Sequence, residues 1–276
     1  MKEKLSVFIL VLFSLIIMSS CTMERKLALE FVEQESKMTP IMVVPPPLLN
    51  MYNNKPIQTG GMHGHYDYDS LSFHQSKFLQ YISDSAFLEN YLNTFISSLQ
   101  NYKLNVYLPD QLESFIQEPS LAYIFRFAQM ELIEEMTSWE IEEQINFKKK
   151  TKIIPLNNIS LNTWFEVSQK DSSAYFTYFD EQSVSDDYYG DFTQNVWNLD
   201  IVYDYTLIPM EQNDIYEFAS YVGKLHASYF YDLILNTYIW SRLPEDRKDN
   251  YIFLHYDHDY HMVEAAETTF TRIMDK

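Results

Sequence analysis

A short segment near the C-terminus holds the densest group of side chains able to do chemistry. Residues 255–261 read His-Tyr-Asp-His-Asp-Tyr-His, so imidazoles and carboxylates alternate closely. Imidazole and carboxylate groups are the ligands of zinc and similar ions. If the segment is helical, His258 and His261 are neighbours. If it is an extended strand, four of the side chains share one face: His255, Asp257, Asp259 and His261.

The sequence shows no distant carboxylate that would complete a metal site with this cluster. Adjacent ligands in one short segment rarely all reach the same ion. We therefore interpret 255–261 as a polar loop or strand rim, and we assign no metal ligand, cofactor or catalytic residue. The alternative is a metal-dependent hydrolase that uses His255, His258 or His261, and the chain is not assigned as an enzyme.

The remaining histidines form weaker candidates. His63, His65 and His74 lie in or beside a glycine-containing loop, and only tertiary folding could bring them to the C-terminal cluster. His226 lies on the apolar stripe of an expected helix, where a hydrogen-bonded core histidine is the usual case. Gly223 beside it is expected to let this helix pack closely against a neighbour.

Six glutamates between Glu131 and Glu143 precede a run of lysines from Lys148 to Lys152. Paired carboxylates perform glycoside hydrolysis, but this pattern is typical of a solvated face followed by a basic turn. No nucleophile elbow, HExxH helix or phosphate-binding loop occurs. A Ser-His-Asp triad assembled from distant residues stays open because geometry, not spacing, defines it.

The single cysteine, Cys21, follows a targeting signal. Lys2 and Lys4 give a short positive region, and residues 5–18 are apolar except for two serines. This stretch is too short to cross a bilayer core of ~30 Å as a helix. Two serines then precede the cysteine. The order resembles the bacterial lipoprotein signal, whose lipobox ends in the modified cysteine.

This resemblance implies that signal peptidase II cuts before Cys21, which becomes the diacylated and usually N-acylated first residue. Met18 stands where the lipobox usually has Leu, a side chain of similar size and polarity. Several acyl chains anchor a protein stably, whereas one chain binds only marginally. Thr22, rather than Asp, favours the outer membrane of a Gram-negative envelope. The lack of a following acidic run favours its periplasmic face.

Composition limits the function classes further. The 276 residues include 39 acidic and 20 basic side chains, a net charge of −19, which argues against a nucleic-acid partner. Removing residues 1–20 takes away two lysines and one glutamate and leaves about −20. An apolar fraction of 46%, with 16% aromatic residues, is enough for a folded core. One cysteine excludes an intramolecular disulfide and a multi-cysteine zinc site.

The elements that must position these groups follow from hydrophobic periodicity. We expect a signal peptide over 1–20, a tether or short helix over 21–38, and a single α+β domain over 39–276. The sheet is expected to be mixed or antiparallel, flanked by at least two amphipathic helices. Asp84 is expected to cap one helix, and a long one lies near 213–241.

Strands are expected where β-branched and aromatic residues are bounded by turn signals. The turn signals are Asn157-Asn158, Asp171-Ser172-Ser173 and Tyr189-Gly190-Asp191. A further strand begins the ambiguous segment 120–136. The expected strands near the middle and start of the chain are 41–44, 104–108, 159–168, 174–180 and 195–208. The order of elements over 40–107 is similar to the opening of periplasmic lipoprotein domains of the curli-secretion and penicillin-binding-protein-activator type, a similarity of element order alone.

The leading hypothesis is an outer-membrane lipoprotein whose soluble domain binds or scaffolds another envelope component. The expected partners are the membrane, through the lipid, and an envelope protein or glycan. Glycan binding through exposed Tyr and Trp side chains is the alternative from a different class. Its candidates begin at Tyr175, Phe176, Tyr178 and Phe179 and continue to Trp197 and Tyr205.

Overall fold

The structure is a computed structural model, and it describes five stretches of the chain: residues 23–56, 73–119, 121–145, 147–194 and 200–273. The expected signal peptide over 1–20 and the residue Thr22 lie outside these stretches, as do the candidate site residues Cys21, His63, His65 and Trp197.

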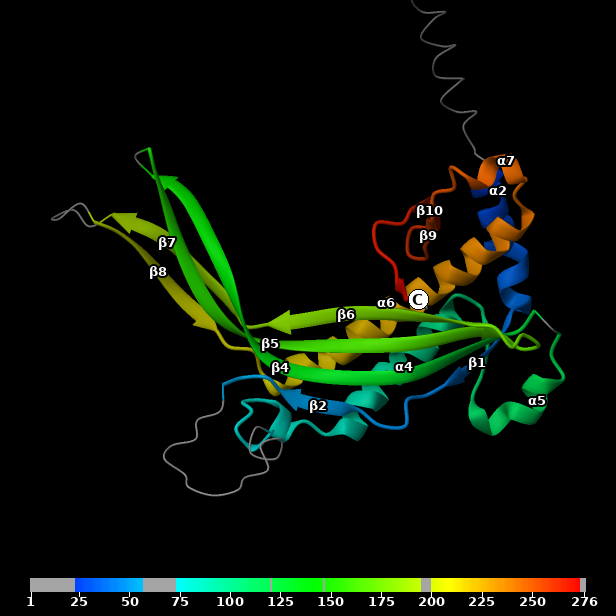
Figure 1. Cartoon of the computed structure of the whole chain (residues 1–276), viewed down its shortest axis with the longest axis horizontal. Helices are drawn as coiled ribbons and strands as arrows, with labels where there is room; N and C mark the ends of the chain where they lie inside the picture. Colours follow the sequence, from blue (N-terminus) through cyan, green and yellow to red (C-terminus); the bar gives the residue numbers. More distant parts are fainter. Residues whose placement is uncertain (1–22, 57–72, 120, 146, 195–199, 274–276) are drawn as a thin grey trace, which may run out of the picture.

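A mixed seven-stranded sheet forms the centre of the molecule (Figure 1). Strand β1 pairs in parallel with β3 and β4, whereas β4, β5, β6 and β11 follow one another as antiparallel neighbours. The strands in sheet order are β11 (Thr271–Ile273), β6 (Tyr175–Ser185), β5 (Lys148–Gln169), β4 (Tyr123–Ile145), β1 (Pro40–Val44) and β3 (Asn105–Tyr107), and β2 (Asn50–Asn53) pairs with the middle of β4.

Two helices, α4 (Asp84–Asn101) and α6 (Gln212–Arg242), pack against each other and against one face of the sheet. The expected α+β class, mixed sheet and long helix are therefore confirmed. Ser83, not Asp84, caps α4, because its hydroxyl accepts the Ala86 N–H at 3.3 Å. Gly223 lies where the helices meet, and a Cβ there would come within 2.4 Å of the Tyr91 carbonyl oxygen.

Aromatic rings fill the space between the helices and the sheet. Phe125 of β4 is fully buried, and its ring centroid lies 5.3 Å from that of Phe95 on α4 and 4.3 Å from that of Phe230 on α6. Phe127 and Phe165 join the same cluster. Burying such side chains is the largest favourable contribution to the stability of the fold.

Shorter elements complete the body. α2 (Met23–Glu30) continues as a π-helical turn (Phe31–Glu35) and a 3-10 turn (Ser36–Met38). This segment packs on α6 through buried Ala28 and Phe31, so it is a docked helix and not a free tether. The others are η3 (Leu79–Tyr81), η4 (Pro109–Gln111), α5 (Leu112–Ile116), α7 (Glu245–Lys248), β9 (Leu254–Asp257) and β10 (Met262–Ala265).

Two hairpins extend from one end of the sheet and form a projection that we call the arm (Figure 1). The first consists of the distal halves of β4 and β5, residues 136–156, and the second of β7 (Asp187–Gln194) with β8 (Ile201–Ile208). Among the described strands, β7 and β8 pair only with each other. No helix among the described residues is long and apolar enough to cross a membrane.

Two of the turns expected from the sequence are strands in the structure. Asn157-Asn158 is not a turn but part of β5, because both side chains find partners in the fold that a turn would not provide. Tyr189-Gly190-Asp191 likewise lies inside β7. A Cβ at Gly190 would come within 2.5 Å of the Asp204 carbonyl oxygen, so this glycine permits close strand pairing and does not mark a turn.

Candidate functional site

Helix α6 holds strand β9 through two buried polar side chains one turn apart. The Asp232 carboxylate accepts the Tyr256 N–H at 3.0 Å and contacts His255 Nδ1 at 2.7 Å. The Asn236 amide donates to the Leu254 carbonyl at 2.7 Å and accepts the Leu254 N–H at 2.8 Å. β9 is therefore fixed in position and rotation by the helix.

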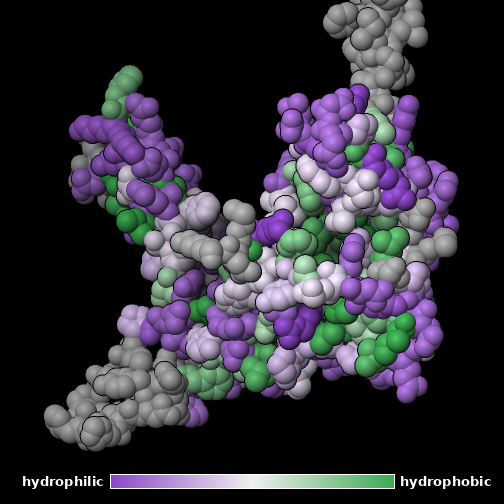
Figure 2. All heavy atoms as spheres, turned by 45° about the vertical axis from the view of Figure 1, so that its right-hand side comes forward, coloured by the Kyte–Doolittle hydropathy of each residue, from purple (hydrophilic) through white to green (hydrophobic). Residues whose placement is uncertain are grey.

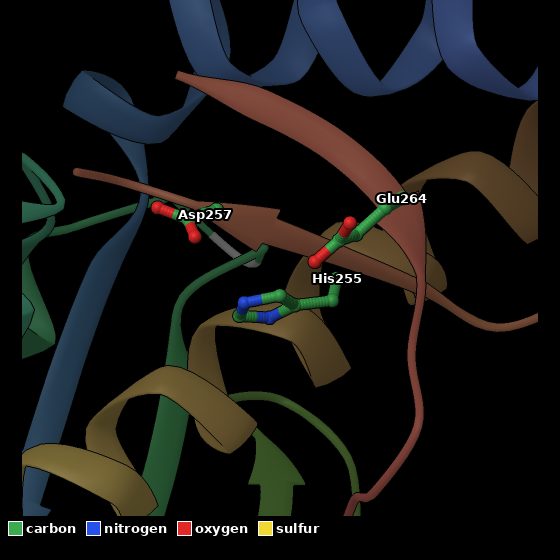
Figure 3. A group of neighbouring side chains, drawn as sticks. All are labelled: His255, Asp257 and Glu264. Atoms are coloured by element: carbon green, nitrogen blue, oxygen red, sulfur yellow. The ribbon is translucent and has the colours of Figure 1, made fainter. Parts of the chain in front are cut away.

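The β9–β10 hairpin brings one histidine and two carboxylates together (Figure 3). His255 and Asp257 share a face of β9 because they are two residues apart, and Glu264 of β10 is directly paired with His255. One potential ligand atom from each side chain lies within 4.8 Å of the others. Asp232 engages His255 Nδ1, so Nε2 is the ring nitrogen available to a ligand.

The other members of the 255–261 cluster do not join this group. β9 ends at Asp257, and the following turn directs Asp259 towards Lys224, with 3.7 Å between its carboxylate and the ammonium. His261 adopts a positive φ of 51° and its Nδ1 lies 3.0 Å from the Tyr256 hydroxyl. The prediction of one shared face is therefore wrong beyond Asp257, because the hairpin turn interrupts the strand. It is correct for His255 and Asp257 but not for Asp259 and His261.

A pocket of about 510 Å³ opens beside the three side chains, between α4, α6 and the β9–β10 hairpin. Tyr102, Tyr229 and His258 contribute ring surfaces to it. The Tyr229 hydroxyl lies 2.8 Å from Thr268 Oγ1, which ties the segment after β10 to α6. The pocket thus combines aromatic walls with a group of polar side chains, as small-ligand sites commonly do.

The described lining of the pocket is acidic. It contains four acidic residues, Asp257, Asp259, Glu264 and Glu267. Lys224 is the one lysine or arginine in this described lining. The Asp232 carboxylate raises the pKa of His255 above its ordinary value through their hydrogen bond. Burial raises the pKa of the Tyr102 hydroxyl to about 12, so this group is a neutral hydrogen-bonding partner at physiological pH. The arrangement suits a cation.

His226 is the hydrogen-bonded core histidine that the sequence suggested. It is fully buried, with Nδ1 at 2.6 Å from the Tyr91 hydroxyl and Nε2 at 2.9 Å from the Asp180 carboxylate. Burial lowers its pKa, against the opposing effect of Asp180. Both ring nitrogens are used within the core, so His226 is not positioned to bind a ligand.

The arm is the second candidate surface. Apolar and aromatic side chains lie exposed along it, and Figure 2 shows apolar groups at several places on this projection. Phe147, at the tip of the first hairpin, is 99% exposed and has a φ of 63°. Phe147 lies in the tight turn between the paired residues Ile145 and Lys148, where a positive φ is common, although a bulky side chain is less favourable there than glycine. The other exposed large side chains of the arm are Met136, Trp139, Ile153, Tyr189, Val202, Tyr205 and Ile208.

One face of the second hairpin is predominantly aromatic. Strand pairing places Phe192 opposite Tyr203, and Gly190 opposite Tyr205. The Lys152 ammonium of the first hairpin lies 5.3 Å from the Tyr205 ring centroid, a cation–π contact that links the two hairpins.

A buried polar network fixes the base of the arm. The Glu134 carboxylate accepts the Lys55 ammonium at 2.5 Å and the backbone N–H groups of Lys77, Phe78 and Leu79 at 2.7, 2.9 and 3.1 Å. Burial alone would raise the pKa of Glu134, but these hydrogen bonds outweigh it and hold the pKa below its ordinary value.

Asp186 is a second buried hydrogen-bond acceptor, and it lies between β6 and β7. It accepts the N–H groups of Asn157 at 3.0 Å and Met210 at 2.9 Å, and the Asn157 side chain also contacts it. Burial opposes these interactions, yet the pKa of Asp186 is lowered because they prevail. The direction in which both hairpins leave the sheet is therefore set by buried carboxylates.

Several of these residues escaped the sequence analysis. Glu264 was missed because the pairing of two four-residue strands decides its position, although the alternation in Met-Val-Glu-Ala was a weak signal. Asp232 had a clearer signal, since it is a lone carboxylate within the apolar run of α6. Glu134 belongs to the glutamate-rich stretch interpreted as a solvated face, but its side chain is fully buried.

His74 lies just before η3 and α4, where its ring packs on Phe73 at 6.1 Å between centroids. It is not part of the group around His255.

No protein-family model matches the chain, and the comparison with curated proteins gives no match.

Proposed function

We propose that this chain is an envelope lipoprotein, anchored by acyl chains on Cys21, whose domain binds or scaffolds another envelope component through the arm. The anchor rests on the sequence signal before Cys21. Its proposed location is the outer membrane, facing the periplasm. The observation that carries the binding role is Phe147, an almost fully exposed aromatic side chain with a positive φ at the tip of the arm.

The arm offers what a protein interface needs. Trp139, Tyr189 and Tyr205 are large aromatic side chains of the kind that dominate binding energy at interfaces. The buried carboxylates Glu134 and Asp186 hold the base of the arm, so the base does not have to be ordered on binding. The body contributes the rigid support.

Glycan binding remains the second candidate, favoured by one specific observation. Trp139 is 58% exposed, and on the other hairpin Tyr189 and Tyr205 also present their rings to solvent. Aromatic faces of this kind stack against sugar rings. The hydrolase alternative would require a metal ion bound by the histidine and carboxylate side chains of the β9–β10 hairpin.

The anchor is tested with Cys21→Ala and radiolabelled palmitate. We expect label on the native protein and none on the variant; label retained by the variant would reject the anchor.

The arm is tested by cross-linking and pull-down from native envelopes with Trp139→Ala. Trp240→Ala is the matched control, because Trp240 is also exposed, at 45%, but lies on α6 of the body. We expect Trp139→Ala to lose a stoichiometric partner that the control retains. Equal recovery with both variants would contradict the proposal. A purified-glycan titration of native protein, followed by tryptophan fluorescence, decides between the protein and glycan candidates.

A further inference from the structure

The β9–β10 hairpin lies on the body, away from the arm (Figure 1), so a site there is independent of the arm. We propose that His255, Asp257 and Glu264 bind one divalent transition-metal ion, with Asp232 as the residue that positions His255. Potential ligand atoms of the three side chains already lie within 4.8 Å of one another. They come from two paired strands, so the hairpin itself brings them together.

The histidine distinguishes this group from an ordinary cluster of surface acids. His255 Nδ1 is 2.7 Å from the carboxylate of Asp232, which is buried on α6. A carboxylate in this position fixes the ring and its tautomer and leaves the Nε2 lone pair for a metal. The same carboxylate accepts the Tyr256 N–H, so its own orientation is fixed by the strand that carries His255.

Asp257 is oriented as well. Its Oδ1 accepts the N–H groups of Asp259 at 2.8 Å and Tyr260 at 2.9 Å, which directs this carboxylate at the start of the turn. Glu264 is exposed, and Figure 3 shows its carboxylate on the side of the His255 ring, so this side chain is free to adjust its position. Two ligands are therefore preset, and the third has freedom to close on an ion.

Charge favours a cation at this place. The described pocket lining holds four carboxylates, on Asp257, Asp259, Glu264 and Glu267, against one ammonium, on Lys224. That ammonium is paired at 3.7 Å with Asp259, outside the ligand group. Asp257 and Glu264 flank His255, and no lysine or arginine of the described lining lies between them, so a metal ion would reduce their repulsion.

The ligand chemistry indicates the class of ion. Imidazole suits zinc and its neighbours, whereas sites of oxygen ligands alone suit magnesium and calcium. Metal–ligand distances of roughly 2.0–2.2 Å require the three groups to draw together by on the order of 1 Å. Three protein ligands leave a coordination position open, as in zinc sites that bind a further ligand. The adjoining pocket provides space for one.

The test uses the mature chain, purified without a metal-affinity tag and stripped with a chelator. Titration with Zn²⁺ is followed by calorimetry, and bound metal is counted by mass spectrometry after dialysis. We expect one ion per chain, and Mg²⁺ not to compete. Glu264→Gln and Asp257→Asn should each weaken Zn²⁺ binding by about tenfold or more. Glu267→Gln, a carboxylate of the same pocket outside the ligand group, is the matched control and should bind as the native chain does.

Asp232→Asn tests the positioning role. It should weaken Zn²⁺ binding by roughly 10–100-fold and alter the visible spectrum of the Co²⁺-substituted protein, while circular dichroism shows that the variant is folded. If this variant does not fold, Glu264→Gln and Glu267→Gln still decide the matter because both side chains are exposed. Absence of Zn²⁺ binding by the folded native chain would overturn the site. Equal losses in Glu264→Gln and Glu267→Gln would also overturn it, since they would indicate diffuse binding to an acidic surface.

Discussion

The body and the arm use the same kinds of residue in opposite ways. Phe125 in the body is 0% exposed and is surrounded by other rings, whereas Phe147 in the arm is 99% exposed. Gly223 lets two helices of the body meet, and Gly190 lets two strands of the arm pair closely. Stability is therefore concentrated in the body. The arm carries aromatic side chains that stay exposed after folding, and this difference is the basis of the binding role that we propose for it.

The two regions also differ in how polar groups are used. The body buries Asp232 and Asn236 to hold β9, while the base of the arm buries Glu134 and Asp186 to hold the two hairpins. Beyond that base the arm depends on its backbone ladders and on contacts such as the one between Lys152 and Tyr205. The body should therefore unfold cooperatively, and the arm should loosen locally.

The largest contrast should come from removing a phenylalanine in each region. Phe125→Ala leaves a cavity in the core and should lower the free energy of unfolding by about 3–5 kcal/mol. Phe147→Ala removes a solvated side chain and should change it by less than about 0.5 kcal/mol. Urea denaturation monitored by circular dichroism measures both. Similar losses for the two variants would remove the distinction between body and arm.

An acid titration addresses the base of the arm. The pKa of Glu134 in the folded chain lies below its ordinary value of 4.5, so its contribution is complete above pH 4.5 and is lost as the pH falls below this value. Glu134→Gln should lower the free energy of unfolding at pH 7 by about 2–3 kcal/mol, because Lys55 and three backbone N–H groups lose an ionised acceptor.

The same variant should show a weaker loss of stability between pH 5 and pH 3 than the native chain, measured by urea denaturation at each pH. Glu131→Gln is the control, since Glu131 lies on the same strand but is not buried. Identical pH profiles for the native chain and Glu134→Gln would show that this carboxylate does not hold the arm.

The two glycines provide a third test, with one substitution in two settings. Gly223→Ala places a methyl group against the Tyr91 carbonyl and should destabilise the whole fold by about 1–3 kcal/mol. Gly190→Ala creates an equally close contact with Asp204, but it should only loosen the second hairpin. Hydrogen exchange distinguishes them: faster exchange throughout α4 and α6 is expected for the first, and faster exchange confined to β7 and β8 for the second. Global loss from Gly190→Ala would mean that the arm is part of the core.

A further substitution should have a small effect of the opposite sign. Phe147→Gly relieves the positive φ of a bulky residue and should raise the free energy of unfolding by about 0.5–1 kcal/mol. A stabilising change that also weakens partner binding would mark Phe147 as a residue kept for function. Thermal unfolding measures the change in stability of Phe147→Gly, and Trp139→Ala is measured alongside it for comparison. A loss of stability in Phe147→Gly would show that Phe147 supports the hairpin.

Hydrophobic periodicity was sufficient to predict α4 and α6, because each helix buries a long stripe of its own residues. The short apolar run of β1 was also recognisable, and together these elements gave the α+β class. It failed where distant partners decide the outcome. Asn157 and Asn158 have the composition of a turn, yet Asp186 and Glu135 hold them inside a strand. The long glutamate-rich strand β4 has no apolar alternation in its outer half, since that half belongs to the exposed arm.

The site near His255 was predictable only in part. The sequence placed His255 and Asp257 on one face, which is correct, and extended that face to His261, which is wrong. Glu264 enters through the register of β9 with β10, and Asp232 through the packing of α6. The register has no local signal strong enough to be found without the tertiary structure, and the lone carboxylate in the apolar run of α6 does not reveal its partner.

Site-specific photo-cross-linking in native envelopes tests most directly whether the arm is the binding surface of a lipid-anchored protein. A photoreactive amino acid replaces Phe147 in one strain and Tyr81 in another. Tyr81 is also well exposed, at 64%, but it lies on the body. We expect a discrete cross-linked product from position 147 that is absent from position 81 and lost with Cys21→Ala. No product from position 147, or the same product from both positions, would contradict the account.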